Sequence, residues 1–405
     1  YANTTGSANT AVGSFCLDSA TTGSNNTAVG YNSLASTTTG SDNVAMGRAA
    51  LNANTTGTRN VAIGYAALTA ATTASYNTAV GYSALDDTTT GGSNSAIGYG
   101  SGWSVTTGSS NTSLGAWSLH NCTTASYNTA VGYYALLSDT DGTQNTGIGN
   151  QSLQNCTSGS YNTAVGQASL HTQTTASYNT GVGIDSLKYA TTGAANTAIG
   201  GYALVDLTTG ASNTALGYDA GESITTGTNN VAVGRDCLDT ATTGNYNTAI
   251  GNVAGDNITT GDGNICIGHQ SGGSASPSGS LTTEDWRVCI GDNSITNAHI
   301  KVDWTIPSDE RDKTDIQDIS RGLDFVNQLK PKSFWFRKER GSDVKHGGKH
   351  LGFIAQDILA LEGDDAIIID DKDTDHLKYT GGHLIPVLVN AIKELSAKVE
   401  ALEAK

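Results

Sequence analysis

The sequence is short of proline, of charged residues and of aromatic residues. Its 405 residues include 4 prolines, and charged and aromatic residues make up 14% and 6% of the chain. In a globular enzyme about a quarter of the residues carry charge. A hydrophobic content of 37% is equally unlike a disordered tail. Because 50 residues are glycine, the composition favours a regular, mainly β architecture with many tight turns.

Basic side chains are almost absent from the first 300 residues. The last 105 residues hold 16 of the 21 lysines and arginines, and the other five are Arg48, Arg59, Lys188, Arg235 and Arg287. A net charge of −16 argues against binding to nucleic acid or to an anionic membrane through a basic patch. No run of about 20 apolar residues occurs, so no membrane insertion is expected.

A five-residue motif, Asn-(Thr/Ser/Val/Ile)-small-aliphatic-Gly, recurs every 17 residues without a slip. We number the coil positions from this Asn as position 1. A strict period indicates coils that stack directly on one another. Alternating segments separated by Gly and T-T-G-S turns predict a parallel β-solenoid with two short strands per coil. The sixteen copies begin at Asn9, Asn26, Asn43, Asn60, Asn77, Asn94, Asn111, Asn128, Asn145, Asn162, Asn179, Asn196, Asn213, Asn230, Asn247 and Asn264.

Position 3 is small in every copy, and position 4 is always aliphatic or Met. Position 3 is Ala except at Ser113, Gly147, Gly181 and Cys266. Because neighbouring strand residues point to opposite faces, we expect position 4 to fill the core and position 3 to lie outside. An outer position that stays small indicates a close neighbour, for which the simplest candidate is the same strand of another subunit. We therefore predict a homotrimer around a threefold axis.

The cysteines and histidines suggest no metal site. The six cysteines show no C-x-x-C spacing and are interpreted as small buried thiols. Cys266 and Cys289 occupy similar positions in neighbouring coils and are the one pair that merits a check for a disulfide. His346 and His350 are four residues apart, but no cysteine or acidic ligand set accompanies them. We expect neither a metal nor another cofactor.

Aromatic residues recur at positions 6 and 17, where tyrosines would stack on neighbouring coils. Asn at position 1 would form an internal amide ladder. Trp103 and Trp117 lie in the least regular coils and are the candidate contacts with a receptor. Carbohydrate is one candidate for the chemical class of that receptor.

The repeats N-T-A-V-G and N-V-A-I-G resemble the head repeats of trimeric autotransporter adhesins, which form left-handed parallel β-rolls in trimers. The resemblance covers residues 1–270, although the period of 17 is longer than the usual adhesin repeat. At about 4.8 Å per coil, the repeats would build a rod about 77 Å long.

The period breaks after Gly272, and the composition becomes that of an α+β domain from Ser308 onward. We therefore predict a solenoid shaft at 1–270, a neck at 271–307 with one degenerate coil (287–291), and a third domain at 308–405.

The segment from Ser308 to Ile316 resembles the S-D-x-R-x-K-x-x-I opening of a self-cleaving intramolecular chaperone domain. That domain ends phage tailspikes, endosialidases and L-shaped tail fibres, and it also occurs in myelin regulatory factor. One departure is Asp312, where the family more often has Leu. Further matching segments are Gly322–Pro331, Ser333–Phe336, His350–Gln356, Tyr379 and the final helix.

The resemblance implies that Ser308 is a nucleophile and Lys313 its general base, because a serine hydroxyl attacks only when a base takes its proton. It also implies one self-cleavage, which releases the chaperone after trimerisation. The expected cut is the Pro307–Ser308 bond, and the bond after Ser308 is the alternative. On a purely structural interpretation, Ser308 is only the N-cap of a short helix.

The end of the chain carries a heptad pattern with spacings of three and four. Such a seam is typical of a coiled coil, and the same pattern also fits a helix packed on its own domain. The seam residues are Ile385, Leu388, Ile392, Leu395, Val399 and Leu402.

These features predict a viral tail fibre or receptor-binding structural protein, located in the virion and matured by a single-turnover Ser–Lys autoprotease. The expected partners are two more copies of the chain, an upstream tail or capsid attachment protein and a host surface receptor. The alternative is a cellular surface adhesin or structural fibre of the trimeric adhesin type, in an extracellular location.

Overall fold

The computed structural model describes residues 3–274, 276–296, 299, 301, 307–337, 341–372, 374 and 377–404. The chain divides into two compact units, Tyr1–Asp292 and Asn293–Lys405. The division falls inside the segment predicted to be a neck. Among the described residues, none of the helices is long and apolar enough to cross a membrane.

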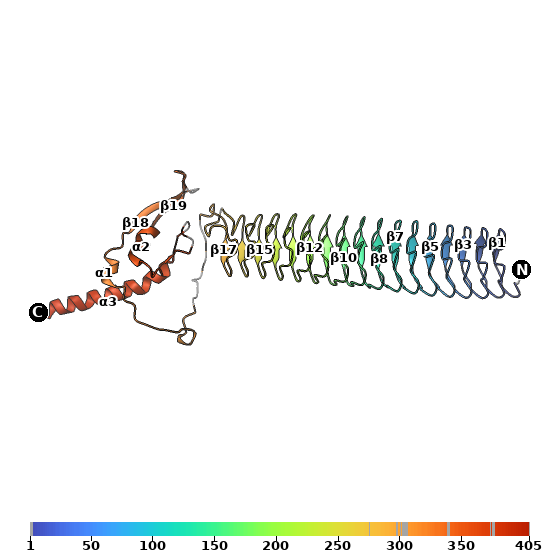
Figure 1. The fold of residues 1–405 in the computed structure, drawn as a ribbon, viewed down its shortest axis with the longest axis horizontal. Coiled ribbons are helices and arrows are strands. Elements are labelled where there is room, and N and C mark those ends of the chain that lie inside the picture. Colours follow the sequence, from blue (N-terminus) through green and yellow to red (C-terminus); the bar gives the residue numbers. More distant parts are fainter. Residues whose placement is uncertain are drawn as a thin grey trace. The chain divides into compact units, whose positions relative to one another are not determined.

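The first unit is a parallel β-solenoid in which each repeat contributes one three-residue strand (Figure 1). Neighbouring strands pair in parallel with no change of register, so that Ala28 lies opposite Ala45. The predicted fold class, a mainly β solenoid followed by a small α+β region, is confirmed. The strands are β1 Thr10–Val12, β2 Thr27–Val29, β3 Val44–Met46, β4 Val61–Ile63, β5 Thr78–Val80, β6 Ser95–Ile97, β7 Thr112–Leu114, β8 Thr129–Val131, β9 Thr146–Ile148, β10 Thr163–Val165, β11 Thr180–Val182, β12 Thr197–Ile199, β13 Thr214–Leu216, β14 Val231–Val233, β15 Thr248–Ile250, β16 Ile265–Ile267 and β17 Val288–Ile290.

The prediction of an asparagine ladder at position 1 is confirmed. In the third coil, the Asn43 backbone N–H donates to Asn26 Oδ1 at 3.1 Å, and Asn43 Nδ2 donates to the Gly57 carbonyl at 2.9 Å. These side chains are buried from the second coil onward. Each amide therefore satisfies backbone groups that a thin core would otherwise leave unpaired.

Position 5 must be glycine because successive coils approach each other closely there. Gly64 has φ +136°, and a Cβ on it would lie 2.2 Å from the Gly81 carbonyl oxygen of the next coil. No side chain fits at that distance, so one such glycine per coil sets the tight stacking.

The predicted orientation of positions 3 and 4 is wrong. From the second coil onward, position 3 is buried inside the chain's own coil; Ala45 and Ala62, for example, are 0% exposed. Position 4 points outward, with Met46 43% and Ile199 40% exposed. The small residue is required because the inside of a 17-residue coil is already filled by Leu at position 9. Position 3 is therefore kept small by side chains of its own chain inside the coil, and not by a second subunit.

The prediction of two strands per coil is also wrong. The opposite side of the coil carries residues in the left-handed conformation, such as Ala66 and Leu68, both with φ 53°. Such residues interrupt an extended strand. Backbone hydrogen bonds still join this side from coil to coil, as in Leu68 N–H to the Ala84 carbonyl at 3.0 Å.

The segment 287–291, predicted to be a degenerate coil, contains the last described strand of the stack. Its strand β17 pairs with β16, and Cys266 lies opposite Cys289. The spacing between these two cysteines is 23 residues, six more than elsewhere. The extra residues follow Gly272 and begin the Ser/Gly/Pro stretch.

The second unit is a small α+β body. Strands β18 and β19 form one antiparallel pair, and β20 and β21 form another. The elements are a 3₁₀ helix at Glu310–Asp312, α1 Leu323–Val326, β18 Lys332–Arg337, β19 Lys345–Gly352, α2 Ala355–Glu362, β20 Ile369–Asp370, β21 Lys378–Tyr379, a 3₁₀ helix at Gly381–His383 and α3 Leu384–Glu403.

A buried carboxylate organises the core of this unit. The Glu362 side chain is fully buried and accepts the backbone N–H groups of residues 367–369, each at 3.0 Å. Arg321 lies 3.4 Å from the same carboxylate. The surrounding apolar core contains Ile358, Ile368, Ile369, Leu384 and Val387. The charge is therefore compensated by hydrogen bonds and by an ion pair, as a buried carboxylate requires.

Candidate functional site

The structure brings Ser308 and Lys313 together. Lys313 Nζ lies 2.7 Å from Ser308 Oγ and 3.1 Å from the Ser308 carbonyl oxygen. The short 3₁₀ helix at Glu310–Asp312 produces this contact, because it turns the chain back over five residues. Lys313 ends that turn, and its backbone N–H donates to the Glu310 carbonyl at 3.1 Å.

The cap of the short helix is Asp309 and not Ser308. The Asp309 carboxylate accepts from the Arg311 backbone N–H at 2.9 Å and from Arg311 Nη2 at 2.6 Å. The Arg311 guanidinium holds the pKa of the Asp309 carboxyl below its usual value. The interpretation of Ser308 as an N-cap is therefore wrong, and its hydroxyl is left to Lys313.

All parts of this pair are exposed in the single chain. Pro307, Ser308 and Lys313 are each exposed, and so is Asp312, the departure from the family pattern. A lysine amine becomes a general base when a dry environment disfavours its charge. Within the described part of one chain, Ser308 and Lys313 are close enough to form a hydrogen bond, but no neighbouring residues shield them from water.

The two tryptophans predicted as receptor contacts lie together in one aromatic cluster. The rings of Trp103 and Trp117 stack with centroids 5.9 Å apart, and His120 packs against Trp117 at 4.6 Å. Gly100 makes room for them, since a Cβ there would lie 3.0 Å from the Trp117 ring. Both tryptophans are half-buried. Part of each ring face is thus covered by the neighbouring aromatic ring.

The tyrosines continue this cluster toward the N-terminus. Tyr65, Tyr82 and Tyr99 stack at centroid distances of 5.0 and 5.1 Å, and Tyr99 contacts Trp117 at 4.9 Å. The predicted stacking of tyrosines on neighbouring coils is confirmed for these residues. Aromatic pairs of this kind stabilise the coils themselves.

Sequence reasoning missed an exposed apolar surface on the solenoid. The outward side chains at position 4 form one continuous row, which we call the position-4 file. Its exposed members are Val12, Met46, Ile63, Ile97, Leu114, Ile148, Ile199, Leu216, Ile250, Ile267 and Ile290, each 38–59% exposed. The aliphatic residue at position 4 of every repeat was visible in the sequence, but it was assigned to the inside of the coil and position 3 to the outside.

The heptad seam of α3 forms a second exposed apolar surface. Helix α3 packs on its own unit through Leu384, Val387 and Ala391. The seam residues lie on another face, and Ile392 is 64% and Leu402 70% exposed. The helix therefore uses separate faces for its own domain and for the heptad pattern.

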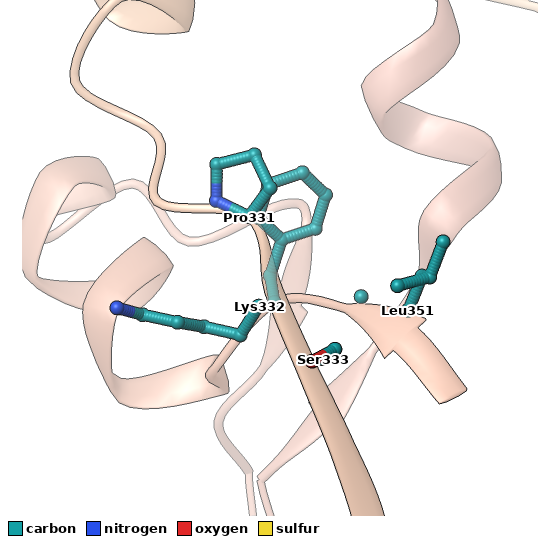
Figure 2. A pocket seen from close by; sticks show the side chains of 6 residues that line it. Pro331, Lys332, Ser333 and Leu351 are labelled. Atoms are coloured by element: carbon teal, nitrogen blue, oxygen red, sulfur yellow. The ribbon is translucent and has the colours of Figure 1, made fainter. Parts of the chain in front are cut away.

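A pocket of about 470 Å³ lies at the base of the β18–β19 hairpin. Figure 2 shows Pro331, Lys332 and Ser333 on one side of it and Leu351 on the other. Leu351 is 86% exposed, so the rim of the pocket is another apolar area that one chain leaves uncovered. In the described ranges, no group of three His, Cys, Asp or Glu side chains is arranged to hold a metal ion.

The comparisons with known proteins identify one segment. Residues 308–366 match the family described as chaperone of endosialidase. The match begins at Ser308 and includes Lys313, both β18 and β19, and α2. No curated protein matches the chain. A β-solenoid followed by this chaperone domain fits a protein of the tail-fibre or endosialidase type.

Proposed function

We propose that this chain is part of a viral tail fibre that assembles as a homotrimer. Its C-terminal domain drives trimerisation and then removes itself by one cleavage next to Ser308. The observation that carries the proposal is the 2.7 Å contact between Lys313 Nζ and Ser308 Oγ at the first residue of the matched chaperone segment.

The proposed reaction needs no group beyond the chain and water. Lys313, in its neutral form, takes the proton from Ser308 Oγ. The oxygen then attacks the Pro307 carbonyl carbon, and the Pro307–Ser308 C–N bond breaks as Lys313 passes the proton to the Ser308 nitrogen. An ester now links Pro307 to Ser308 Oγ. Water hydrolyses this ester and regenerates the hydroxyl. Each chain is cleaved once, so the activity has no turnover.

Trimer formation would supply the cover that the pair lacks. The position-4 file and the α3 seam are long apolar rows on separate units of the chain, and three copies would bury both against their equivalents. A lysine amine acts as a base when burial disfavours its charge, and packing by neighbouring chains would supply this burial. Cleavage is thereby linked to assembly.

The test is the intact mass of the full chain, produced under native assembly conditions. We expect two fragments from the wild type and one uncut chain from Ser308→Ala and from Lys313→Arg, which keeps the positive charge but cannot act as the base. The fragment masses also show on which side of Ser308 the cut lies.

Ser320→Ala is the matched control, because Ser320 is an exposed serine in the same segment outside the pair. This variant should be cleaved like the wild type. A wild-type trimer that stays uncut would refute the autoprotease, and cleavage of Ser308→Ala would assign the chemistry to other residues.

A further inference from the structure

The last coil of the solenoid places two cysteines directly opposite each other. Cys266 in β16 and Cys289 in β17 are register partners in parallel strands. Both occupy position 3, so their side chains point into the same coil interior, with 0% and 6% exposure. All other neighbouring pairs at this position contain Ala, Gly or Ser on at least one side.

The two thiol side chains interact. Burial and, above all, a hydrogen bond with Cys289 raise the pKa of the Cys266 thiol. Gly272 provides the space, because a Cβ there would lie 2.5 Å from Cys266 Sγ. Cys289 Sγ also contacts Ser278 Oγ at 3.1 Å, and Ser278 belongs to the extra residues of this coil. Each cysteine is present as a thiol in this structure.

The backbone separation suits a disulfide. Paired strands run about 4.8 Å apart, within the range of about 4.4–6.8 Å between Cα atoms joined by a disulfide. Stacked Cβ atoms are slightly farther apart than the usual 3.5–4.5 Å or so, so the strands must close up a little. Strand β17 can do this because, among the described strands, it is the last of the ladder and pairs with β16 alone.

We propose that Cys266 and Cys289 are a modification site, at which an oxidising environment forms a disulfide that fastens the last coil to the stack. The reaction is thiol–disulfide exchange with a small-molecule disulfide such as oxidised glutathione. The two thiols lose two electrons and two protons and form one S–S bond, while the oxidant is reduced to two thiols.

The disulfide would act at the C-terminal end of the described ladder. Strand β17 pairs with β16 on one side, and the coil that connects β16 to β17 contains the insertion of six residues. A bond between Cys266 and Cys289 closes this enlarged coil covalently and limits its opening. Formation should be slow, because the buried Cys266 thiol with its raised pKa supplies little thiolate.

The experiment incubates the full chain with oxidised glutathione and counts thiols after denaturation without reductant. We expect the count to fall from six to four and the mass to fall by about 2 Da. Peptide mapping should then link residue 266 to residue 289. Hydrogen exchange of the β17 amides should slow several-fold, and dithiothreitol should reverse all these changes.

Cys266→Ala and Cys289→Ala are suitable controls, because Ala is the usual residue at position 3 and neither change should prevent folding. Both variants should keep the β17 exchange rate of the reduced protein after oxidation. Six remaining thiols, a linkage between other cysteines, or stable glutathione adducts at residues 266 and 289 would each overturn the proposal.

Discussion

Among single residues, Asp139 is the one acidic residue that is fully buried in the described part of the solenoid. It occupies position 12, between Cys122 and Cys156 of the flanking coils, and is 0% exposed. One carboxylate oxygen accepts the Gly142 N–H at 2.9 Å, and the other has no hydrogen-bond partner among the described residues. Burial raises the pKa of Asp139 from 3.8 to about 8. The group is therefore protonated at neutral pH.

This burial predicts a pH-dependent stability that Asp139→Asn removes. The unfolded carboxyl ionises near pH 4, whereas the folded one keeps its proton to about pH 8. Stability is thus full below pH 4, falls as the pH rises through this window, and levels off above it. At pH 9 the variant should exceed the wild type by several kcal/mol in unfolding free energy, with little difference at pH 4. Urea unfolding followed by circular dichroism at several pH values measures this.

Asp141→Asn provides the control for Asp139. Asp141 lies two residues away in the same coil, but its side chain is exposed. Its substitution should change the pH profile only slightly, because burial raises the pKa of Asp139 more than the charge of Asp141 does. Equal profiles for wild type and Asp139→Asn would show that the carboxyl is solvated in the folded chain.

Residue identity alone could predict the repeat and its buried asparagines. It could not predict which of positions 3 and 4 faces the inside of the coil. Positions 3 and 4 are both apolar, and alternation says only that they face opposite sides. The deciding factor is volume, because Leu34 and its equivalents at position 9 leave room only for a small residue such as Ala, Gly or Ser. That information becomes visible once the coil is closed.

At the scale of one coil, a large buried side chain at position 9 can be replaced by one at position 12, which keeps the buried volume about the same. Most coils have Leu at position 9 and a smaller residue at position 12, as in Leu187 and Ala190. Where position 9 is Gly221, position 12 is Ile224, and a Cβ on Gly221 would lie 3.0 Å from Ile224 Cδ1. The bulky side chain has moved three residues along the coil without changing the core.

This exchange predicts a compensating pair of substitutions. Ile224→Ala should cost about 2–4 kcal/mol through the cavity it leaves, and Gly221→Leu should be destabilising through overpacking. The double variant recreates the pattern of Leu187 and Ala190, and Leu at position 9 already adopts the left-handed conformation elsewhere. It should regain most of the loss in urea unfolding. Additive losses in the double variant would contradict volume exchange.

For the second unit, sequence motifs located the elements but not their packing. The resemblance placed Ser308 and Lys313 five residues apart, and the turn that joins them required the Asp309 cap. The heptad pattern of α3 left open whether the seam served the helix's own domain. The structure shows that it does not, because α3 packs on its own unit through Leu384, Val387 and Ala391, which lie on another face. Which face of a helix is buried depends on the tertiary structure, so the heptad pattern alone could not decide it.

For the whole molecule, the solenoid has a thin core and a long apolar exterior. Each coil encloses little more than one Leu and two or three small side chains, while the position-4 file stays exposed along the stack. Burial of such a file by sister chains would stabilise every coil by a small, repeated amount. Every copy of the chain carries the same position-4 file, so a symmetric assembly could bring equivalent files together.

The last prediction tests this assembly with charge placed inside or outside the proposed interface. Aspartate at Ile148, Ile199 and Ile250, all in the position-4 file, would bring like charges together around the threefold axis. Both sets of substitutions are made in the uncut Ser308→Ala chain. Light scattering after size exclusion should give three chain masses of 41.4 kDa for the parent chain and one for this variant, with an unchanged circular dichroism spectrum. Aspartate at Thr175, Thr192 and Thr243, exposed at position 14, adds equal charge away from the file and should leave the trimer intact. A monomeric parent chain, or equal behaviour of the two variants, would show that the file does not hold the chains together.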